Sequence, residues 1–481
     1  MINFRAVIHI LSALLVFLGV SLIAPTLIAL YYREGDSQAF IVTTAIAWIM
    51  GIVGFLSSKT KSELRPKDGF LIVTAGWLLF AFIGALPFYL SGFIPSYTDS
   101  FFETMSGFTT TGASILTNIE ALPHGLLFWR SLTHWLGGMG IILLSLAILP
   151  FLGVGGMQLF KAEVPGPTHD KLTPRLKSTA KLLWGVYALI SLVETILLKL
   201  AGMTWFDALC HTFGTMATGG FSTKNASIGQ YNNPLIDYII IVFMILAGIN
   251  FALHYRALRG KPQVYFKDAE AKFFVGIILF ATLLIGIDVW KVTGNQFFKT
   301  IKYSLFQVVS IITTTGFGTA DYEQWSGLSQ ATLFFLMFFG GCAGSTGGGI
   351  KIIRTLILLK LGMTEIKRLI HPQAVFTVRV GNNVIPREIA ANIAGFFLLY
   401  VALTVFGILF MSMLGLDFET AFGSVAATIN NIGPGLGQVG PMENYANIPV
   451  VGKWFLSFLM LAGRLEIFTV LILFTLSFWK K

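Results

Sequence analysis

Long apolar runs restrict the folds open to this chain more than any other feature. Ten runs approach or exceed about 20 residues, the length with which an α-helix crosses about 30 Å of hydrocarbon. Backbone amides in lipid need partners within the protein, so we interpret the runs as helices. They lie at 4–32, 38–57, 69–93, 126–151, 180–203, 235–256, 271–291, 330–360, 389–414 and 449–477. The stretch 340–349 is too rich in glycine for a continuous helix, so we expect the run 330–360 to be broken within the bilayer. The sequence therefore predicts an all-α polytopic membrane protein.

The composition excludes several classes of protein. Hydrophobic types make up 55% of residues and charged types 12%, whereas soluble domains have about 25% charged residues. A soluble enzyme and a disordered chain are both excluded. The two cysteines suggest no disulfide framework, and the histidines do not cluster with Cys or acidic residues at metal-ligand spacing. We expect no enzymatic activity, no bound cofactor and no resident metal site.

The distribution of Lys and Arg predicts the orientation of the spans. With the N-terminus inside, 24 of the 33 basic residues fall on the inner side and 8 on the outer side, and Arg464 lies within a span. Because cytoplasmic loops carry the excess of Lys and Arg, both termini are expected in the cytoplasm. The net charge of +10 then reflects topology and contact with anionic lipid, and it requires no nucleic-acid partner.

Four outward-facing connections resemble one another. Each combines a segment of about a dozen residues, too short to cross the bilayer, with a glycine at its end. Such segments must enter the membrane and return, and non-helical backbone at that depth is tolerated where it is buried in protein or lines water. Four of them around one axis predict a pore. They are 100–112, 207–219, 304–316 and 421–433.

The span after each connection carries small residues that permit close helix approach, at 137–140, 247–250, 340–343 and 462–465. With these features the chain resembles the membrane subunit of the Trk/Ktr/HKT potassium transporter superfamily, most closely its bacterial TrkH branch. The most specific segments are 340–351, 430–437 and 463–469.

The resemblance implies a fold of two leading helices followed by four helix–pore loop–helix repeats in a pseudo-fourfold array, assembled as a homodimer. The corresponding parts are a leading two-helix domain at 1–60, pore repeat 1 at 61–160, pore repeat 2 at 161–260, pore repeat 3 at 261–370 and pore repeat 4 at 371–481.

A dehydrated cation needs replacement oxygens, which rings of backbone carbonyls provide without fixed charge. Glycine accepts positive φ and lets successive carbonyls turn toward an axis. The expected potassium-binding filter comprises Thr110, Thr111, Gly112, Ala217, Thr218, Gly219, Thr314, Thr315, Gly316, Asn431, Ile432 and Gly433. The resemblance implies that glycine in all four loops accompanies potassium preference. Glu103 lies near the start of a short helix, where an acidic group is favourable for structural reasons, and a direct contact with the ion is the alternative.

An arginine in a membrane span is costly and suggests a function. Arg464 could be a buried partner of Glu466 or of carbonyl oxygens. The resemblance instead suggests that Arg464 obstructs the path below the filter together with a glycine-rich loop, which comprises Gly344, Ser345, Thr346, Gly347, Gly348 and Gly349.

The resemblance also implies a partner, TrkA, a cytosolic nucleotide-binding ring that controls opening. The basic segments 152–181 and 351–387 are large enough to dock it, and contact with lipid is the other interpretation of their charge. The expected function is potassium uptake across the bacterial inner membrane through a gated, channel-like pore. An alternating-access symporter that couples potassium to protons or sodium is the alternative, although carriers commonly have inverted halves rather than four parallel repeats.

Overall fold

Helices form nearly all of the regular structure in this computed structural model, which describes residues 2–60, 64–148, 176–290, 294, 296–381 and 383–480. The strands of the described part form one short antiparallel hairpin, β1 (Arg379–Val380) with β2 (Asn383–Val384). Six described helices are long and apolar enough to cross a membrane, or up to eight if each of two bent pairs counts as one span. The all-α polytopic class is confirmed.

Two predicted spans are missing from that count. The run 330–360 is broken, as its glycines predicted, and the run 126–151 extends beyond residue 148, where the described part stops.

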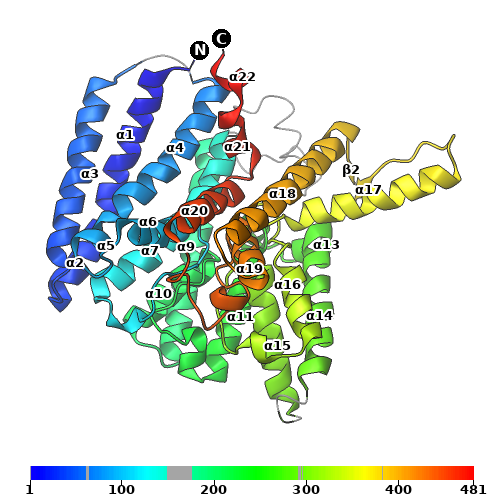
Figure 1. Ribbon diagram of the computed structural model, residues 1–481. Coiled ribbons are helices and arrows are strands. Elements are labelled where there is room, and N and C mark those ends of the chain that lie inside the picture. The colour runs from blue at the N-terminus through cyan, green and yellow to red at the C-terminus, as the bar shows by residue number, and fades with distance from the viewer. Residues whose placement is uncertain are drawn as a thin grey trace.

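The leading helices are α1 (Phe4–Ser21), α2 (Ile23–Tyr32) and α3 (Ser37–Ser57). α1 and α2 together form one span of 29 residues. α3 packs so tightly on α1 that a Cβ on Gly54 would come closer than 3.0 Å to the Ser12 hydroxyl. Figure 1 shows these helices side by side at one edge of the molecule.

Four groups of helices follow, and each contains one helix of 12 or 16 residues that ends within one of the four predicted connections; we call these four the short helices. The first comprises α4 (Pro66–Gly84), α5 (Leu86–Leu90), α6 (Tyr97–Phe108), η1 (Ile119–Ala121) and α7 (His124–Ile148). The second comprises α9 (Leu176–Leu200), α10 (Trp205–Met216), η2 (Ser227–Tyr231), α11 (Pro234–Gly248) and α12 (Phe251–Leu258).

The third group comprises α13 (Val264–Lys267), α14 (Ala269–Val289), α15 (Phe297–Ile312), η3 (Tyr322–Gln324), α16 (Gly327–Leu336) and α17 (Ile352–Ile370). The fourth comprises α18 (Arg387–Met413), α19 (Phe418–Ile429), η4 (Gly437–Val439), α20 (Val450–Arg464), α21 (Phe468–Leu471), η5 (Ile472–Phe474) and α22 (Leu476–Trp479). α17 projects from the helix bundle in Figure 1.

Three of the short helices begin at polar caps. Ser96, Thr204 and Asp417 accept hydrogen bonds from backbone amides in the first turns of α6, α10 and α19. The bonds from the Thr420 amide and hydroxyl hold the pKa of the exposed Asp417 carboxyl below its usual value. Each of these three helices has 12 residues, which rise only about 18 Å and cannot cross a bilayer.

Two predicted continuous spans are bent, which corrects the interpretation of 235–256 and 449–477 as simple crossings. α11 and α12 meet at 104°, and α20 meets the segment Phe468–Phe474, which comprises α21 and η5, at 114°. At the first bend the Gly248 carbonyl, released from the helix, accepts a hydrogen bond of 2.8 Å from the Cys342 amide. The break is thus compensated by backbone from another part of the chain, which hydropathy does not reveal.

The two termini lie at the same end of the molecule (Figure 1). The Lys67 ammonium, at the start of α4, donates hydrogen bonds to the carbonyls of Ser477, Phe478 and Lys480 at 2.9 to 3.3 Å. This contact ties the C-terminal helix α22 to the N-terminal end of α4.

Candidate ion-conduction site

The four short helices end in the same backbone conformation. The second residue after each helix has a left-handed φ of 52 to 61°, at Thr110, Thr218, Thr314 and Asn431. The fourth residue is a glycine with φ of 79 to 97°, at Gly112, Gly220, Gly316 and Gly433. Left-handed φ costs free energy in residues that carry a Cβ. Its recurrence at one position in four separate segments therefore indicates a functional site with a specifically maintained backbone geometry.

Identical hydrogen bonds hold these four ends. After α6, the Thr110 amide bonds to the Gly107 carbonyl at 3.0 Å and the Thr111 amide to the Ser106 carbonyl at 2.8 Å. The same two bonds follow α10, α15 and α19, from Thr218 and Gly219, from Thr314 and Thr315, and from Asn431 and Ile432. They satisfy carbonyls that a buried helix end would leave without partners.

We name the four ends by residues: loop 1 is 109–112, loop 2 is 217–220, loop 3 is 313–316 and loop 4 is 430–433. In loop 2 the left-handed glycine is Gly220, one residue beyond the last residue of the expected filter. Ala217 therefore corresponds to Thr109, and Gly219 corresponds to Thr111. The adjacent glycines 219 and 220 allowed either register from sequence. Gly219 has no left-handed φ, but a side chain does not fit there, because a Cβ would meet the His134 ring.

The four loops contact one another in a closed cycle. A Cβ on Gly112 would come closer than 3.0 Å to the Gly219 carbonyl oxygen of loop 2. The same holds between loops 2 and 3, 3 and 4, and 4 and 1, for Gly220 with Thr315, Gly316 with Ile432, and Gly433 with Thr111. Each left-handed glycine thus lies against a carbonyl of the next loop, and the order 1, 2, 3, 4 returns to 1. We call this arrangement the four-loop ring.

Side chains add further links within the ring. The Asn431 amide donates to the Thr111 hydroxyl at 2.9 Å, which joins loop 4 to loop 1. Paired hydroxyls stiffen two of the loops, Thr109 with Thr111 at 2.8 Å and Thr313 with Thr315 at 2.7 Å. These polar groups are buried, and their hydrogen bonds to one another hold the loops in a defined geometry.

The glycine-rich segment between α16 and α17 packs against the ends of the short helices. The Thr346 hydroxyl donates to the Met216 carbonyl, the last residue of α10, at 2.9 Å. The Gly348 amide donates to the Thr314 hydroxyl at 2.7 Å, and a Cβ on Gly348 would clash with the Asn430 carbonyl. The predicted gate residues 344–349 therefore touch loops 3 and 4 and the end of α10.

Arg464 completes these contacts. Its side chain is 2% exposed and donates to the Thr346 carbonyl at 2.7 Å and to the Gly137 carbonyl at 3.3 Å. Gly137 in turn lies against the Phe108 carbonyl at the end of α6. Arg464 thus binds carbonyls and not Glu466, which pairs with Arg354 at 2.6 Å.

Sequence reasoning missed the groups that anchor both ends of the glycine-rich segment. One oxygen of the buried Glu270 carboxylate accepts the Ala343 amide at 2.8 Å and the Ile353 amide at 3.0 Å. The buried Lys351 ammonium donates to the Gly347 carbonyl. An acidic residue in the first turn of a span was the available signal for Glu270, because an intramembrane carboxylate needs a specific partner.

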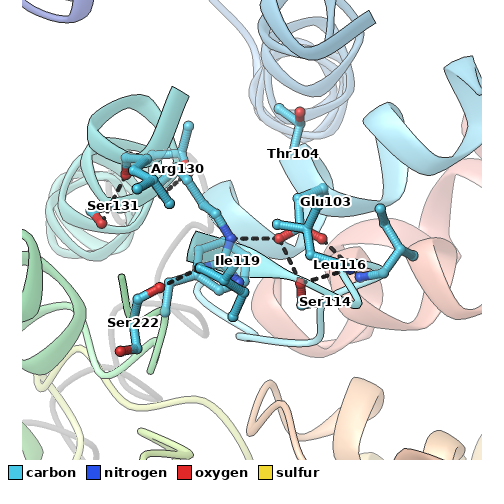
Figure 2. Close-up of polar contacts among 12 residues, drawn as sticks. Glu103, Thr104, Ser114, Leu116, Ile119, Arg130, Ser131 and Ser222 are labelled. Carbon is cyan, nitrogen blue, oxygen red and sulfur yellow. Dashed lines mark hydrogen bonds and ion pairs between the residues drawn. The ribbon is translucent and has the colours of Figure 1, made fainter. Parts of the chain in front are cut away.

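Glu103 has no role as a free ion ligand in this arrangement. Its carboxylate is 1% exposed and is paired with Arg130 of α7 at 2.6 Å (Figure 2). Among the described residues, no group of three His, Cys, Asp or Glu side chains is placed to hold a metal ion.

Comparison with known proteins gives the family. The model described as "TrkH: Cation transport protein" matches residues 36–481. The chain is 44% identical over 485 residues to the Trk system potassium uptake proteins TrkH of Salmonella typhimurium and of Escherichia coli K12, with 100% of each chain covered. It is 38% identical to TrkG of Escherichia coli K12, over 99% of each chain.

A crystal structure agrees with these matches. The potassium transporter TrkH from Vibrio parahaemolyticus superposes with a TM-score of 0.92 at 40% identity, over 100% of both chains. The protein is thus a transporter rather than an enzyme, as its sequence predicted. On this full-length similarity of sequence and fold, the chain belongs to the TrkH family of cation transport proteins.

Proposed function

We propose that this chain takes up potassium ions through a channel-like pore whose filter is the four-loop ring. The observation that carries the proposal is the closed cycle of contacts between left-handed glycines and neighbouring carbonyls. The names of its full-length relatives, Trk system potassium uptake proteins, agree with this substrate. The four matching helix ends support a pseudo-fourfold array of four helix–pore loop–helix repeats after the leading helices.

Backbone carbonyls of the ring replace the hydration shell of the ion. The four helix C-termini that converge on the loops add partial negative charge, which favours a cation without a ring of carboxylates. The filter comprises the expected residues, with Gly220 added to loop 2 as the counterpart of Gly112. Potassium is the substrate, and the ring is its binding site.

We infer that the glycine-rich loop and Arg464 form the gate. Residues 344–349 contact the second, third and fourth groups of helices, and Arg464 bonds to Gly137 of the first group. A guanidinium held here opposes the passage of a cation because the surrounding dielectric is low. Glycines at 344 and 349 with φ of 75 and 62° give the loop conformations that other residues adopt only at a cost.

The topology follows from charge. The excess of Lys and Arg on one side supports a topology with both termini on the cytoplasmic side of a bacterial inner membrane. The shared end of the two termini and the bonds of Lys67 to the C-terminal residues support that placement. The predicted boundaries of the leading domain and the pore repeats near 60, 260 and 370 fall between helices. The boundary near 160 lies outside the described residues.

Two partners belong to the proposal: a second copy of the chain, and a cytosolic TrkA-like nucleotide-binding ring. Of the basic segments that would dock this ring, 152–181 lies almost entirely outside the described residues. The other begins with α17, which projects from the bundle (Figure 1) and carries the partly exposed Arg368. Contact with anionic lipid remains the competing role for these charges.

Tracer potassium uptake into proteoliposomes tests the function. With sodium as competitor, the purified chain is expected to take up potassium down its gradient at a rate that an imposed proton gradient does not change. Uptake that requires a proton or sodium gradient would support the symporter, and absence of potassium uptake in open-gate variants would reject the proposal.

A further inference from the structure

A buried ion pair lies directly behind loops 1 and 2. Glu103 of α6 and Arg130 of α7 approach to 2.6 Å, with side chains 0% and 2% exposed. Figure 2 shows the two side chains meeting between α7 and the segment that follows loop 1. Replacing such a pair by apolar groups often leaves stability unchanged or improves it, so stability alone does not explain its presence.

The Glu103 carboxylate holds the chain that leaves loop 1. One oxygen accepts the Ser114 hydroxyl at 2.9 Å, and the other accepts the Ile115 amide at 2.9 Å. Ser114 is separated from Gly112 by a single residue. Three donors, counting Arg130, therefore fix one carboxylate, and through it the exit of loop 1 is fixed to α6.

The Arg130 guanidinium holds the chain that leaves loop 2. It donates to the Ser222 carbonyl at 2.9 Å, and its central carbon lies 3.5 Å from the centre of the Phe221 ring. Phe221 follows Gly220 directly. The planar guanidinium thus contacts the chain directly after loop 2 by a hydrogen bond and a cation–π contact, while its Nε donates to Glu103.

The corresponding positions of the other short helices carry no such charge pair. Glu103 lies five residues before the end of α6, where α10, α15 and α19 have His211, Gln307 and Ser424. His211 bonds to the Ser222 hydroxyl at 2.9 Å and Gln307 to the Ala320 carbonyl at 3.2 Å, each within its own unit. Ser424 bonds to its own helix, at the Ala421 carbonyl. Of these four positions, the one in α6 carries a carboxylate, and its arginine partner also bonds to the chain that leaves loop 2.

We propose that Glu103 and Arg130 are positioning residues that set the spacing of loops 1 and 2 and thereby the preference for potassium over sodium. The inference rests on the proposed function of the ring. The contact of Gly112 with the Gly219 carbonyl lies between these loops, so any change in their spacing moves carbonyls of the filter. A smaller ion is excluded only while those carbonyls are held at the separation that suits the larger one.

The test removes both charges together, because removing one would leave a buried charge without its partner. The double variant Glu103→Gln/Arg130→Gln is compared with Asp237→Asn/Lys302→Gln, which removes another ion pair, 2.8 Å apart with side chains 4% and 12% exposed, that joins α11 to the N-terminal half of α15. Potassium and sodium tracer fluxes are measured in proteoliposomes for both variants and the parent, each on an open-gate Arg464→Ala background.

The expected result is a fall of about tenfold in the potassium-to-sodium flux ratio of the Glu103/Arg130 double variant, with the ratio of the control pair unchanged. Tenfold corresponds to about 1.4 kcal/mol, which is the scale of one hydrogen bond. An unchanged ratio in the folded double variant would overturn the inference and leave the pair a purely structural role.

Arg130→Lys provides a second variant if the double variant fails to fold. Lysine keeps the charge opposite Glu103 but cannot also bond to Ser222 and lie flat on Phe221. The expected ratio is lower than that of the parent, and a folded Arg130→Lys protein with the parent ratio would contradict the inference. Failure of the proposed function is recognised separately, because the parent background itself would then show no preference for potassium.

Discussion

The Cα of Gly112 faces the carbonyl oxygen of Gly219 so closely that a Cβ on Gly112 would come within 3.0 Å of it. Three equivalent contacts close the cycle around the other loops. Backbone cannot retreat as a flexible side chain does, so an added Cβ must displace a carbonyl of the neighbouring loop. Gly112 also has φ of 83°, which a residue with a Cβ adopts only at a cost.

Gly112→Ser is therefore expected to lower the potassium-to-sodium flux ratio by about tenfold, a loss of about 1.4 kcal/mol in discrimination. The matched control is Gly395→Ser in α18, where an added Cβ has no atom within 4 Å. Tracer fluxes of both ions in proteoliposomes provide the measurement. An unchanged ratio in well-folded Gly112→Ser would remove loop 1 from the filter.

The register of loop 2 gives a second prediction. Gly220→Ala places its Cβ against the Thr315 carbonyl, whereas Gly219→Ala places it against the His134 ring. The double variant Gly219→Ala/His134→Ala removes the imidazole that the added Cβ would meet. It should therefore recover much of the potassium-to-sodium flux ratio that Gly219→Ala loses, with His134→Ala alone as the reference. No side-chain change is expected to rescue Gly220→Ala. Rescue of neither variant, or equal rescue of both by His134→Ala, would contradict the assigned register.

Arg464→Ala is expected to raise partner-free potassium flux, by about tenfold or more, since a fixed charge in a medium of low dielectric opposes the cation. Arg368→Ala, at a partly exposed arginine of α17, is the control. Removal of glycines between 344 and 349 should raise the flux in the same way. If both changes leave the flux of folded protein at the parent value, Arg464 is a structural residue and the gate lies elsewhere.

Glu270 gives a prediction about the gate that is independent of Arg464. Its carboxylate accepts amides on both sides of the glycine-rich loop, from Ala343 and Ile353. Glu270→Ala removes both acceptors and should raise partner-free flux without changing the potassium-to-sodium ratio, because the four-loop ring is not altered. Glu270→Gln keeps an oxygen acceptor and should behave more like the parent. A changed ratio with unchanged flux would contradict this division between gate and filter.

Much of the site was predictable because its signals are local. The short length of the segments before Gly112 and Gly316 predicted helices that do not cross, and the glycines of 340–349 predicted a broken span. The bends after Gly248 and Arg464 were missed because hydropathy records how apolar a segment is and not which other backbone satisfies its carbonyls.

Pairings over long sequence separations were also beyond the sequence. Glu466 lies beside Arg464 in the chain, yet it pairs with Arg354. Glu103 was expected near the start of a short helix, but it lies in the middle of α6, and its partner Arg130 is 27 residues away on another helix. Such partners depend on how helices pack, and one sequence contains no local signal for that.

The central claim, that the ion binds inside the four-loop ring, is tested most directly by anomalous diffraction from crystals grown in rubidium, a heavier substitute for potassium. We expect an anomalous peak enclosed by loops 1 to 4, next to the carbonyls of Thr111, Gly219, Thr315 and Ile432, and a weaker peak there when sodium competes. A protein that transports rubidium but shows its ordered ion elsewhere, with no peak within the ring, would contradict the account.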